Sequence, residues 1–93
     1  MDRRENLLLI VDDDAWTRYA LARLLRYRGW HVQTASCVAE ALDLLDLEPE
    51  CIILDLSLPD GDGASVLRRI REGGQASRVV VCTVSPDASN LEA

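Results

Sequence analysis

Three short, uninterrupted apolar runs constrain the fold of this chain more than any other feature. They occupy residues 7–11, 51–54 and 79–82, and each lacks charged, hydroxyl and amide side chains. Runs of this length and composition are typical of strands that are covered on both faces, as in a parallel sheet. The sequence therefore predicts a sheet that lies between two layers of helices.

Segments of helical or alternating pattern lie between these runs. Apolar residues recur at helical spacing over 15–28, 36–49 and 64–72. Period-two alternation over 30–34 predicts a short strand at the edge of the sheet. This strand–helix alternation, without a linker or an internal repeat, predicts a single α/β domain over residues 1–93 with right-handed crossovers.

The same pattern makes predictions about single residues in the first two helices. Ser36 belongs to the residue types that favour the N-cap, and we expect it to cap the second helix. Arg18, Arg23 and Arg26 are expected to point away from the sheet. The buried face of the first helix is expected to consist of small and apolar residues, namely Thr17, Ala20, Leu21, Leu24 and Leu25.

Charge and cysteine usage exclude several classes of protein. Sixteen acidic and ten basic residues give a net charge of −6, which repels phosphate backbones, so we expect no nucleic-acid binding through this segment. The three cysteines form no C-x-x-C pair and there is one histidine, so neither a zinc site nor a disulfide framework is predicted. The apolar run at 7–11 is too short for a signal peptide or a membrane span. We therefore expect a cytoplasmic protein without a membrane segment.

Acidic and hydroxyl residues follow the apolar runs at the point where each predicted strand ends. Asp12 and Asp13 follow the first run, Asp55 follows the second and Thr83 follows the third. Since ligands of open parallel sheets bind beyond the carboxyl ends of the strands, we expect these side chains to meet there. Clustered carboxylates repel one another unless a cation lies among them, and an all-oxygen cluster suits Mg²⁺ or Mn²⁺. Asp55 is then placed to act as a nucleophile towards phosphorus.

A simpler interpretation of the first acidic group stays open. Residues 12–14 are all aspartates and precede a predicted helix. Aspartate is favoured at the N-cap and interacts well with the helix dipole. The triplet alone is therefore explained equally well by helix capping.

The combined motifs are more specific than their parts. The segment at 55–63 reads D-x-x-L-P-x-x-D-G, the first strand ends in Val11-Asp12-Asp13, and Thr83 ends the last one. Together they resemble the receiver domain of bacterial response regulators. The resemblance extends from residue 7 to about residue 85, which is nearly the whole chain.

The resemblance implies a fold, a function and a set of site residues. The fold is a doubly wound, flavodoxin-like α/β sandwich whose parallel sheet has the order 2-1-3-4. Asp55 accepts a phosphoryl group from a sensor histidine kinase or phosphotransfer protein of a two-component system. Mg²⁺ is ligated by Asp55, by Asp13 directly, by Asp12 through water and by the backbone carbonyl of Ser57. Thr83 hydrogen-bonds the phosphoryl group and starts the conformational switch. Such a protein is a switch and not a turnover enzyme.

Two departures from the family leave room for a different function. The family has a lysine after a fifth strand, whereas all ten basic residues here are arginines. The chain also ends ten residues after Thr83, so we expect the fifth strand and last helix to be missing. The strand at 79–82 is then an edge through which copies are expected to self-associate. The different function is that of a receiver-like interaction module that is not phosphorylated.

Two further classes of protein fit the motifs less well. Dehalogenase-type phosphatases also phosphorylate an aspartate, but they use D-x-D on the first strand, and here Ser57 stands two residues after Asp55. A calcium loop around Asp60 and Asp62 lacks the EF-hand spacing, and Ala64 occupies a ligand position.

Overall fold

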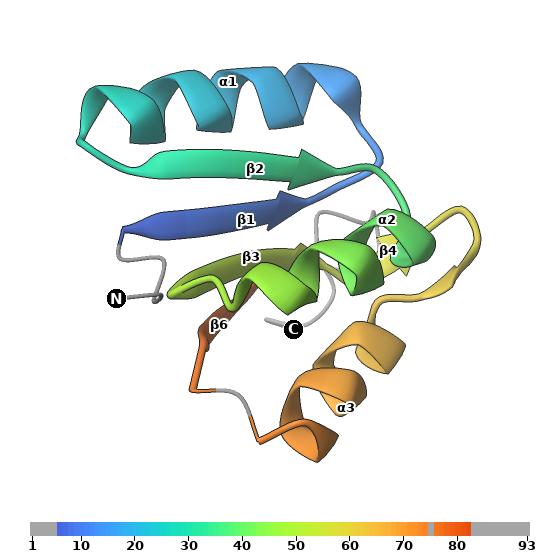
Figure 1. Ribbon diagram of the computed structural model, residues 1–93. Coiled ribbons are helices and arrows are strands. Elements are labelled where there is room, and N and C mark those ends of the chain that lie inside the picture. The colour runs from blue at the N-terminus through green and yellow to red at the C-terminus, as the bar shows by residue number, and fades with distance from the viewer. Residues whose placement is uncertain (1–5, 75, 83–93) are drawn as a thin grey trace, which may run out of the picture.

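The computed structural model describes residues 6–74 and 76–82 and contains the predicted parallel sheet (Figure 1). The sheet has the order β2-β1-β3-β6, and every neighbouring pair is parallel. Its strands are β1 (Leu7–Val11), β2 (His31–Ala35), β3 (Cys51–Asp55) and β6 (Arg78–Cys82). Because β6 is the fourth strand of this sheet along the chain, the predicted order 2-1-3-4 and the edge position of β2 are confirmed.

Helices connect these strands, as predicted. They are α1 (Ala15–Tyr27), α2 (Val38–Leu44), which continues into the 3₁₀ turn η1 (Leu45–Leu47), and α3 (Ala64–Glu72). The segment between β3 and α3 holds a small antiparallel hairpin of β4 (Ser57–Leu58) and β5 (Gly61–Asp62). Within the described ranges, no helix has the length and apolar character needed to cross a membrane.

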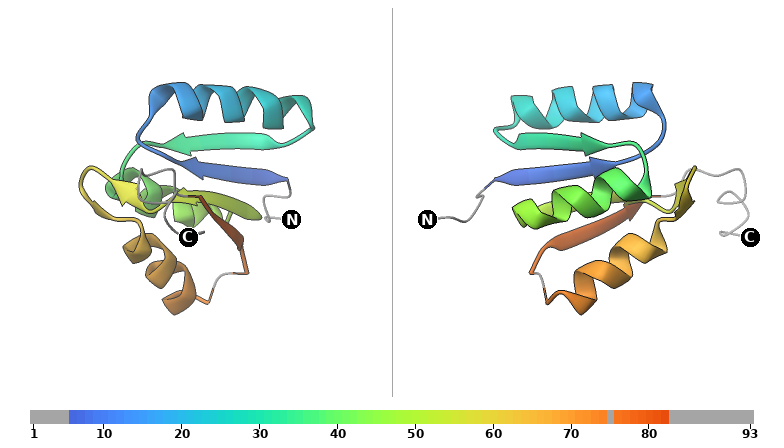
Figure 2. Two further views of the ribbon diagram at one scale, coloured as in Figure 1. Left: turned by 180° about the vertical axis from the view of Figure 1, so that it is seen from behind. Right: turned by 45° about the vertical axis from the view of Figure 1, so that its right-hand side comes forward.

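The helices divide the core into two clusters, one on each face of the sheet (Figure 2). Leu9 and Val11 of β1 pack with residues of α2 and α3, including Ala41 and Val66. Leu8 and Ile10 of β1 pack with Ala22 of α1 on the opposite face. All five residues of β1 are buried, as a strand covered on both faces requires.

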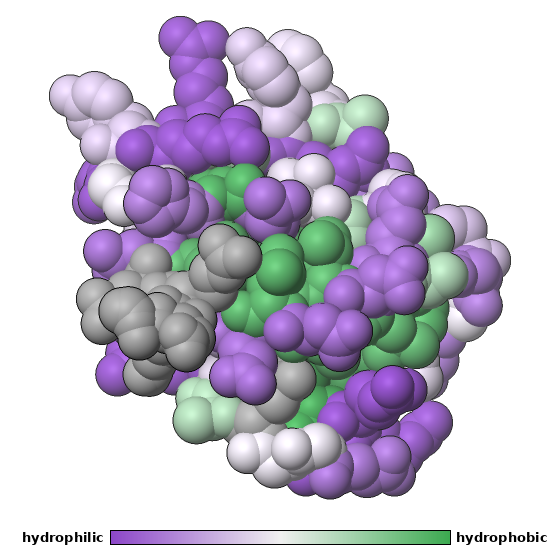
Figure 3. All heavy atoms as spheres, viewed as in Figure 1, coloured by the Kyte–Doolittle hydropathy of each residue, from purple (hydrophilic) through white to green (hydrophobic). Residues whose placement is uncertain are grey.

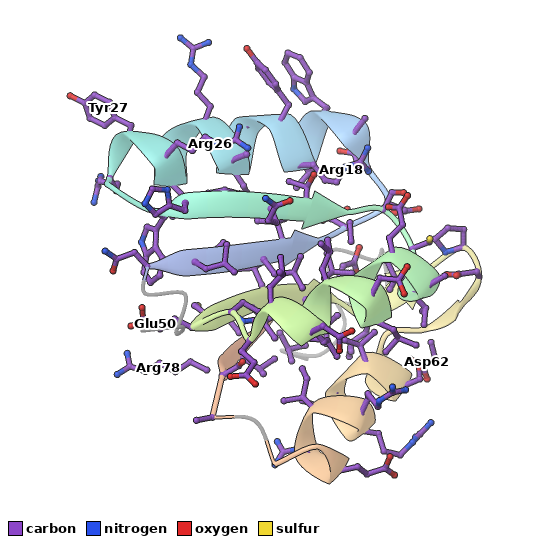
Figure 4. All side chains as sticks on the ribbon, in the orientation of Figure 1. Arg18, Arg26, Tyr27, Glu50, Asp62 and Arg78 are labelled. Atoms are coloured by element: carbon purple, nitrogen blue, oxygen red, sulfur yellow. The ribbon has the colours of Figure 1, made fainter. Side chains whose placement is uncertain are left out.

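The buried face of α1 differs from the predicted one. Ala22 is the buried residue of this helix, whereas Leu24 is 51% exposed and Ala20 is also exposed. Two of the arginines expected to point away from the sheet instead donate hydrogen bonds to backbone carbonyls of the sheet side. Arg18 Nη1 donates to Asp12 O, just after β1, at 2.8 Å, and Arg26 Nη2 donates to Val32 O of β2 at 3.0 Å. Figure 4 shows both arginines on the sheet side of the helix. Small Ala22 allows close approach to the sheet, and Leu21 and Leu25 pack against the core cluster on this side, as predicted.

Two further boundaries also differ from the predictions. The N-cap of α2 is Cys37, and Ser36 instead forms backbone and hydroxyl hydrogen bonds to Glu40 Oε1 at 2.7 and 2.9 Å. Strand β2 is shifted by one residue relative to 30–34, so that Ala35 is buried and Thr34 is exposed. Strand β2 extends to Ala35, whose carbonyl accepts a hydrogen bond from Asp12 N at 3.0 Å.

The strand β6 is less buried than its apolar composition predicts. Val80 and Val81 are 49% and 45% exposed. Self-association through this strand stays a prediction, which sedimentation of the protein would test.

Candidate metal centre

Three carboxylates meet at the carboxyl ends of β1 and β3. Val11 is paired with Leu54 in the parallel register, so Asp12, which follows β1, and Asp55, which ends β3, lie at the same level of the sheet. Oxygen atoms of Asp12, Asp13 and Asp55 lie within 4.8 Å of one another. In Figure 1 the arrowheads of β1 and β2 point to this edge, where the β4–β5 hairpin also lies. The predicted convergence of the three aspartates is confirmed.

The cluster combines buried and exposed carboxylates. Asp12 and Asp55 are each only 8% exposed, whereas Asp13 is exposed. Burial raises the pKa of Asp12 above its ordinary value, and repulsion from Asp55 and Asp13 raises it further. A hydrogen bond from the backbone of Asp14 to Asp12 opposes part of this rise in pKa. A cation among these oxygens would remove the repulsion and favour the charged form of all three.

The position of Asp12 is determined by hydrogen bonds to its backbone as well as its side chain. Its amide donates to Ala35 O at 3.0 Å, and its carbonyl accepts from Arg18 Nη1 at 2.8 Å. Its Oδ1 accepts from Asp14 N at 2.9 Å. The sequence interpretation missed Arg18 as a residue of this site. The available signal was its spacing of four residues from Ala22, which puts both on one side of the helix.

Asp14 does what the capping interpretation expected of the triplet. Its Oδ2 accepts from Thr17 N at 3.0 Å and from the Thr17 hydroxyl. The hydrogen bond from this hydroxyl is the main reason why the pKa of Asp14 lies below its ordinary value. Helix capping and carboxylate clustering therefore both occur, and they are divided among neighbouring aspartates.

The segment after β3 is held tightly against Asp55. Ser57 N donates to Asp55 Oδ1 at 2.9 Å, and Gly63 N donates to Leu56 O at 2.9 Å. A Cβ atom on residue 63 would lie 2.5 Å from Asp55 O and 2.7 Å from Leu56 Cα, so this approach requires glycine. The role of the Ser57 carbonyl as a metal ligand stays a prediction. Thr83 lies outside the described residues.

The donor set fits a hard divalent cation. It consists of carboxylate oxygens with neither nitrogen nor sulfur, from one exposed and two buried side chains. Mg²⁺ is typically bound by one or two carboxylates and retains several waters, which suits a cluster with an exposed member. The three aspartates could therefore hold Mg²⁺, and the chemistry of Mn²⁺ is close enough for it to replace Mg²⁺.

Comparison with known proteins identifies the class to which this fold and cluster belong. Residues 8–93 match the family model of the response regulator receiver domain, and the chain belongs to this family. It is thus a receiver domain of the two-component type, a class of signalling switches. Neither the phosphatase class nor the calcium loop finds support in this assignment.

Three individual relatives illustrate this similarity, and two of them were solved with bound or covalently attached groups. The chain is 36% identical over 83 residues to the response regulator MprA of Mycobacterium sp. (strain KMS), covering 88% of this chain and 36% of MprA. It is 29% identical to the response regulator TrrA of Thermotoga maritima, solved in complex with Mg²⁺-BeF, with a TM-score of 0.78 over 91% of this chain and 76% of that one. A Burkholderia pseudomallei response regulator with a phosphorylated aspartic acid and a calcium ion is 31% identical, with a TM-score of 0.77 over 92% of this chain and 52% of that one. The chain thus spans about a third of the length of the curated relatives it matches.

Proposed function

We propose that this chain accepts a phosphoryl group on Asp55 from a sensor histidine kinase or phosphotransfer protein, with Mg²⁺ bound beside it. The observation that carries the proposal is the cluster of Asp12, Asp13 and Asp55, whose oxygens lie within 4.8 Å of one another. The metal-containing and phosphorylated relatives support it by analogy. A single domain over residues 1–93 and a cytoplasmic location belong to the same proposal.

Each residue of the site has a distinct part in this reaction. Ser57 N holds Asp55 Oδ1 through its hydrogen bond, so that the second carboxylate oxygen is the nucleophile. That oxygen forms a bond to phosphorus while the bond between phosphorus and the donor's histidine nitrogen breaks. Bound Mg²⁺ supplies positive charge that offsets the negative charge of the carboxylates and the phosphoryl oxygens.

The resemblance to receiver domains supplies the division of the metal ligands. Asp13, which is exposed, would be a direct carboxylate ligand, and Asp12, which is buried, would act through a water molecule. The carbonyl of Ser57 completes the protein ligands. Thr83 is assigned the hydrogen bond to the phosphoryl group that triggers the switch.

The outer side of α1 supports docking of a protein partner beside this site. Trp16 and Tyr19 are 74% and 56% exposed, and their rings stack with centroids 5.9 Å apart. Figure 3 shows strongly hydrophilic and nearly neutral side chains together along this helix, and Figure 4 shows Tyr27 pointing outward at the end of the helix farther from the site. The helix contains no acidic residue and begins two residues after Asp13. Exposed aromatics beside arginines are typical of protein interfaces.

The second candidate function is a receiver-like module that binds partners without phosphorylation. The exposed, stacked rings of Trp16 and Tyr19 favour it, since they offer an aromatic surface to a partner whether or not Asp55 is modified. The two functions differ in whether Asp55 is modified.

Labelling with a small phosphodonor separates the two functions. With acetyl phosphate and Mg²⁺, we expect a label on Asp55 that is stable to acid and labile to hydroxylamine, and Asp55→Asn should abolish it. Asp43→Asn, which changes an exposed acid on α2, is the matched control and should label like the wild type. A label on a serine, or one that persists in Asp55→Asn, contradicts the assignment. A folded protein that takes no label supports the interaction module.

A further inference from the structure

The helix α2 begins without a capping side chain of its own. Cys37 occupies its N-cap position and forms no side-chain cap hydrogen bond. The first amides of a helix have no partner within the helix and require an acceptor from elsewhere. In this protein the acceptor comes from a distant part of the chain.

Asp60 supplies that acceptor from the tip of the β4–β5 hairpin. Its Oδ1 accepts from Val38 N at 2.7 Å and its Oδ2 accepts from Ala39 N at 3.1 Å. The hydrogen bond from Val38 is the main reason why the pKa of Asp60 lies below its ordinary value. The contact between hairpin and helix is close, since a Cβ on Gly61 would lie 3.6 Å from Val38 Cγ2. Figure 1 shows the hairpin beside the start of α2.

The other end of the same hairpin forms part of the candidate metal centre. The strand β4 begins at Ser57, whose amide donates to Asp55 Oδ1 at 2.9 Å, and Ser57 is paired with Asp62 across the hairpin. A hairpin of two-residue strands has little stability of its own. Its position therefore depends on contacts with the rest of the protein. At its base these are the hydrogen bond to Asp55 and those from Ala64 N and Ser65 Oγ to Asp62, and at its tip the contact is with α2.

We propose that Asp60 is a positioning residue for the metal centre. By binding the amides of Val38 and Ala39, its carboxylate holds the β4–β5 hairpin and with it the backbone of Ser57 next to Asp55. Loss of Asp60 loosens the Ser57 carbonyl as a metal ligand while Asp12, Asp13 and Asp55 stay in place. This inference rests on the proposed function, because it assigns a supporting residue to the same site.

A matched control distinguishes this role from ordinary helix capping. Glu40 also acts at the start of α2, where its Oε1 accepts from Ser36 N and from Ser36 Oγ at 2.7 and 2.9 Å. These hydrogen bonds lie within the connection from β2 to α2 and do not involve the hairpin. Glu40→Ala and Asp60→Ala should therefore both lower the stability, but only Asp60→Ala should affect the metal.

The experiment measures Mg²⁺ affinity by calorimetric titration of the 93-residue chain and, separately, the rate of labelling by acetyl phosphate as Mg²⁺ is varied. In Asp60→Ala we expect the Kd for Mg²⁺ to rise about 10-fold, the size found when an outer partner of a metal ligand is removed. The labelling rate should recover towards that of the wild type at saturating Mg²⁺. Asp60→Asn keeps one carbonyl oxygen for Val38 N, so its Kd for Mg²⁺ should lie between those of the wild type and Asp60→Ala. Glu40→Ala should keep the Kd of the wild type.

Three results would overturn the inference. The Kd could be unchanged in Asp60→Ala, or it could rise equally in Glu40→Ala, or the labelling rate could stay low at saturating Mg²⁺. If Asp60→Ala does not fold, an unchanged Kd in Asp60→Asn overturns it as well. A wild type that neither binds Mg²⁺ nor labels on Asp55 overturns the proposed function together with the inference. If the wild type does both, any of the three results overturns only the role assigned to Asp60.

Discussion

At the scale of single residues, Asp12 is the member of the cluster whose charged form is disfavoured by burial and by repulsion from its neighbours. It is buried beside two like charges, which is why its pKa is raised. Asp12→Asn keeps an oxygen that can accept from Asp14 N but removes the charge. We expect this variant to be more stable than the wild type at neutral pH without metal, with a midpoint about 4–8 °C higher for each kcal/mol of repulsion relieved. Thermal unfolding in EDTA measures the difference.

The pH dependence of that difference has a definite sign. A raised pKa in the folded state means that the folded protein binds the Asp12 proton more tightly than the unfolded chain does. The wild type should therefore regain stability relative to Asp12→Asn as the pH falls through the raised pKa towards the ordinary value of 3.8. A stability difference that stays constant from neutral pH to pH 4, about the ordinary value, would contradict the electrostatic cause. At saturating Mg²⁺ the wild type should be more stable than Asp12→Asn, the reverse of the order without metal.

Gly63 is the residue whose size the site limits most directly. In Gly63→Ala the added Cβ would meet the backbone of Asp55 and Leu56, which cannot move without displacing the end of β3. We expect a loss of about 1–3 kcal/mol, the usual cost of overpacking, together with weaker Mg²⁺ binding. Urea unfolding and Mg²⁺ titration measure the two effects.

Gly29→Ala is the control for that prediction. A Cβ on residue 29 meets no atom within 4 Å, but its φ of +99° disfavours any residue with a side chain. This variant should lose stability through backbone strain and keep the Mg²⁺ affinity of the wild type. Equal effects of both variants on Mg²⁺ binding would show that Gly63 has no special place in the site.

At the scale of elements, the start of α1 depends on Asp14. Asp14→Ala removes the acceptor for Thr17 N and the Thr17 hydroxyl, so the thermal midpoint should fall by a few degrees. Because the pKa of Asp14 is lowered in the folded state, its charge contributes stability above the ordinary value of 3.8, and this contribution is lost as the pH falls through the lowered pKa. The midpoints of wild type and Asp14→Ala should thus converge in acid. Asp14→Ser, which restores an uncharged cap, should recover most of the loss at neutral pH.

At the scale of the whole molecule, metal binding should couple to folding. Mg²⁺ at 100 times its Kd stabilises a protein with one site by about 2.7 kcal/mol, provided that the unfolded chain does not bind it. We therefore expect the thermal midpoint of the wild type to rise with Mg²⁺ concentration, and Asp13→Asn to abolish most of the rise. An equal rise in both proteins would mean that Mg²⁺ binds elsewhere. Scanning calorimetry at several Mg²⁺ concentrations provides the comparison.

Much of the fold and of the carboxylate cluster could be predicted from the sequence, because both depend on strand order and on which residue ends each strand. The apolar runs at 7–11 and 51–54 predicted buried strands, the resemblance to receiver domains implied that they are neighbours, and Asp12 and Asp55 lie at their ends. The buried face of α1 was predicted only in part. Leu21 and Leu25 pack against the core as expected, whereas Ala22 is buried in place of Ala20 and Leu24, because the face of a short helix depends on what packs beneath it. Arg18 was assigned to solvent by its charge, yet its stem lies on the sheet side and its guanidinium reaches the Asp12 carbonyl.

The sequence by itself determined the α/β class, the parallel sheet and the acidic edge, since these follow from local hydrophobic pattern and from the geometry shared by all parallel strands. Only the tertiary structure decided which of the neighbouring aspartates caps α1 and which join Asp55. It alone showed that Asp60 caps a helix that begins 22 residues earlier in the chain. The physical reason is that a hydrogen bond between distant segments depends on where packing places them, and no local pattern records that placement.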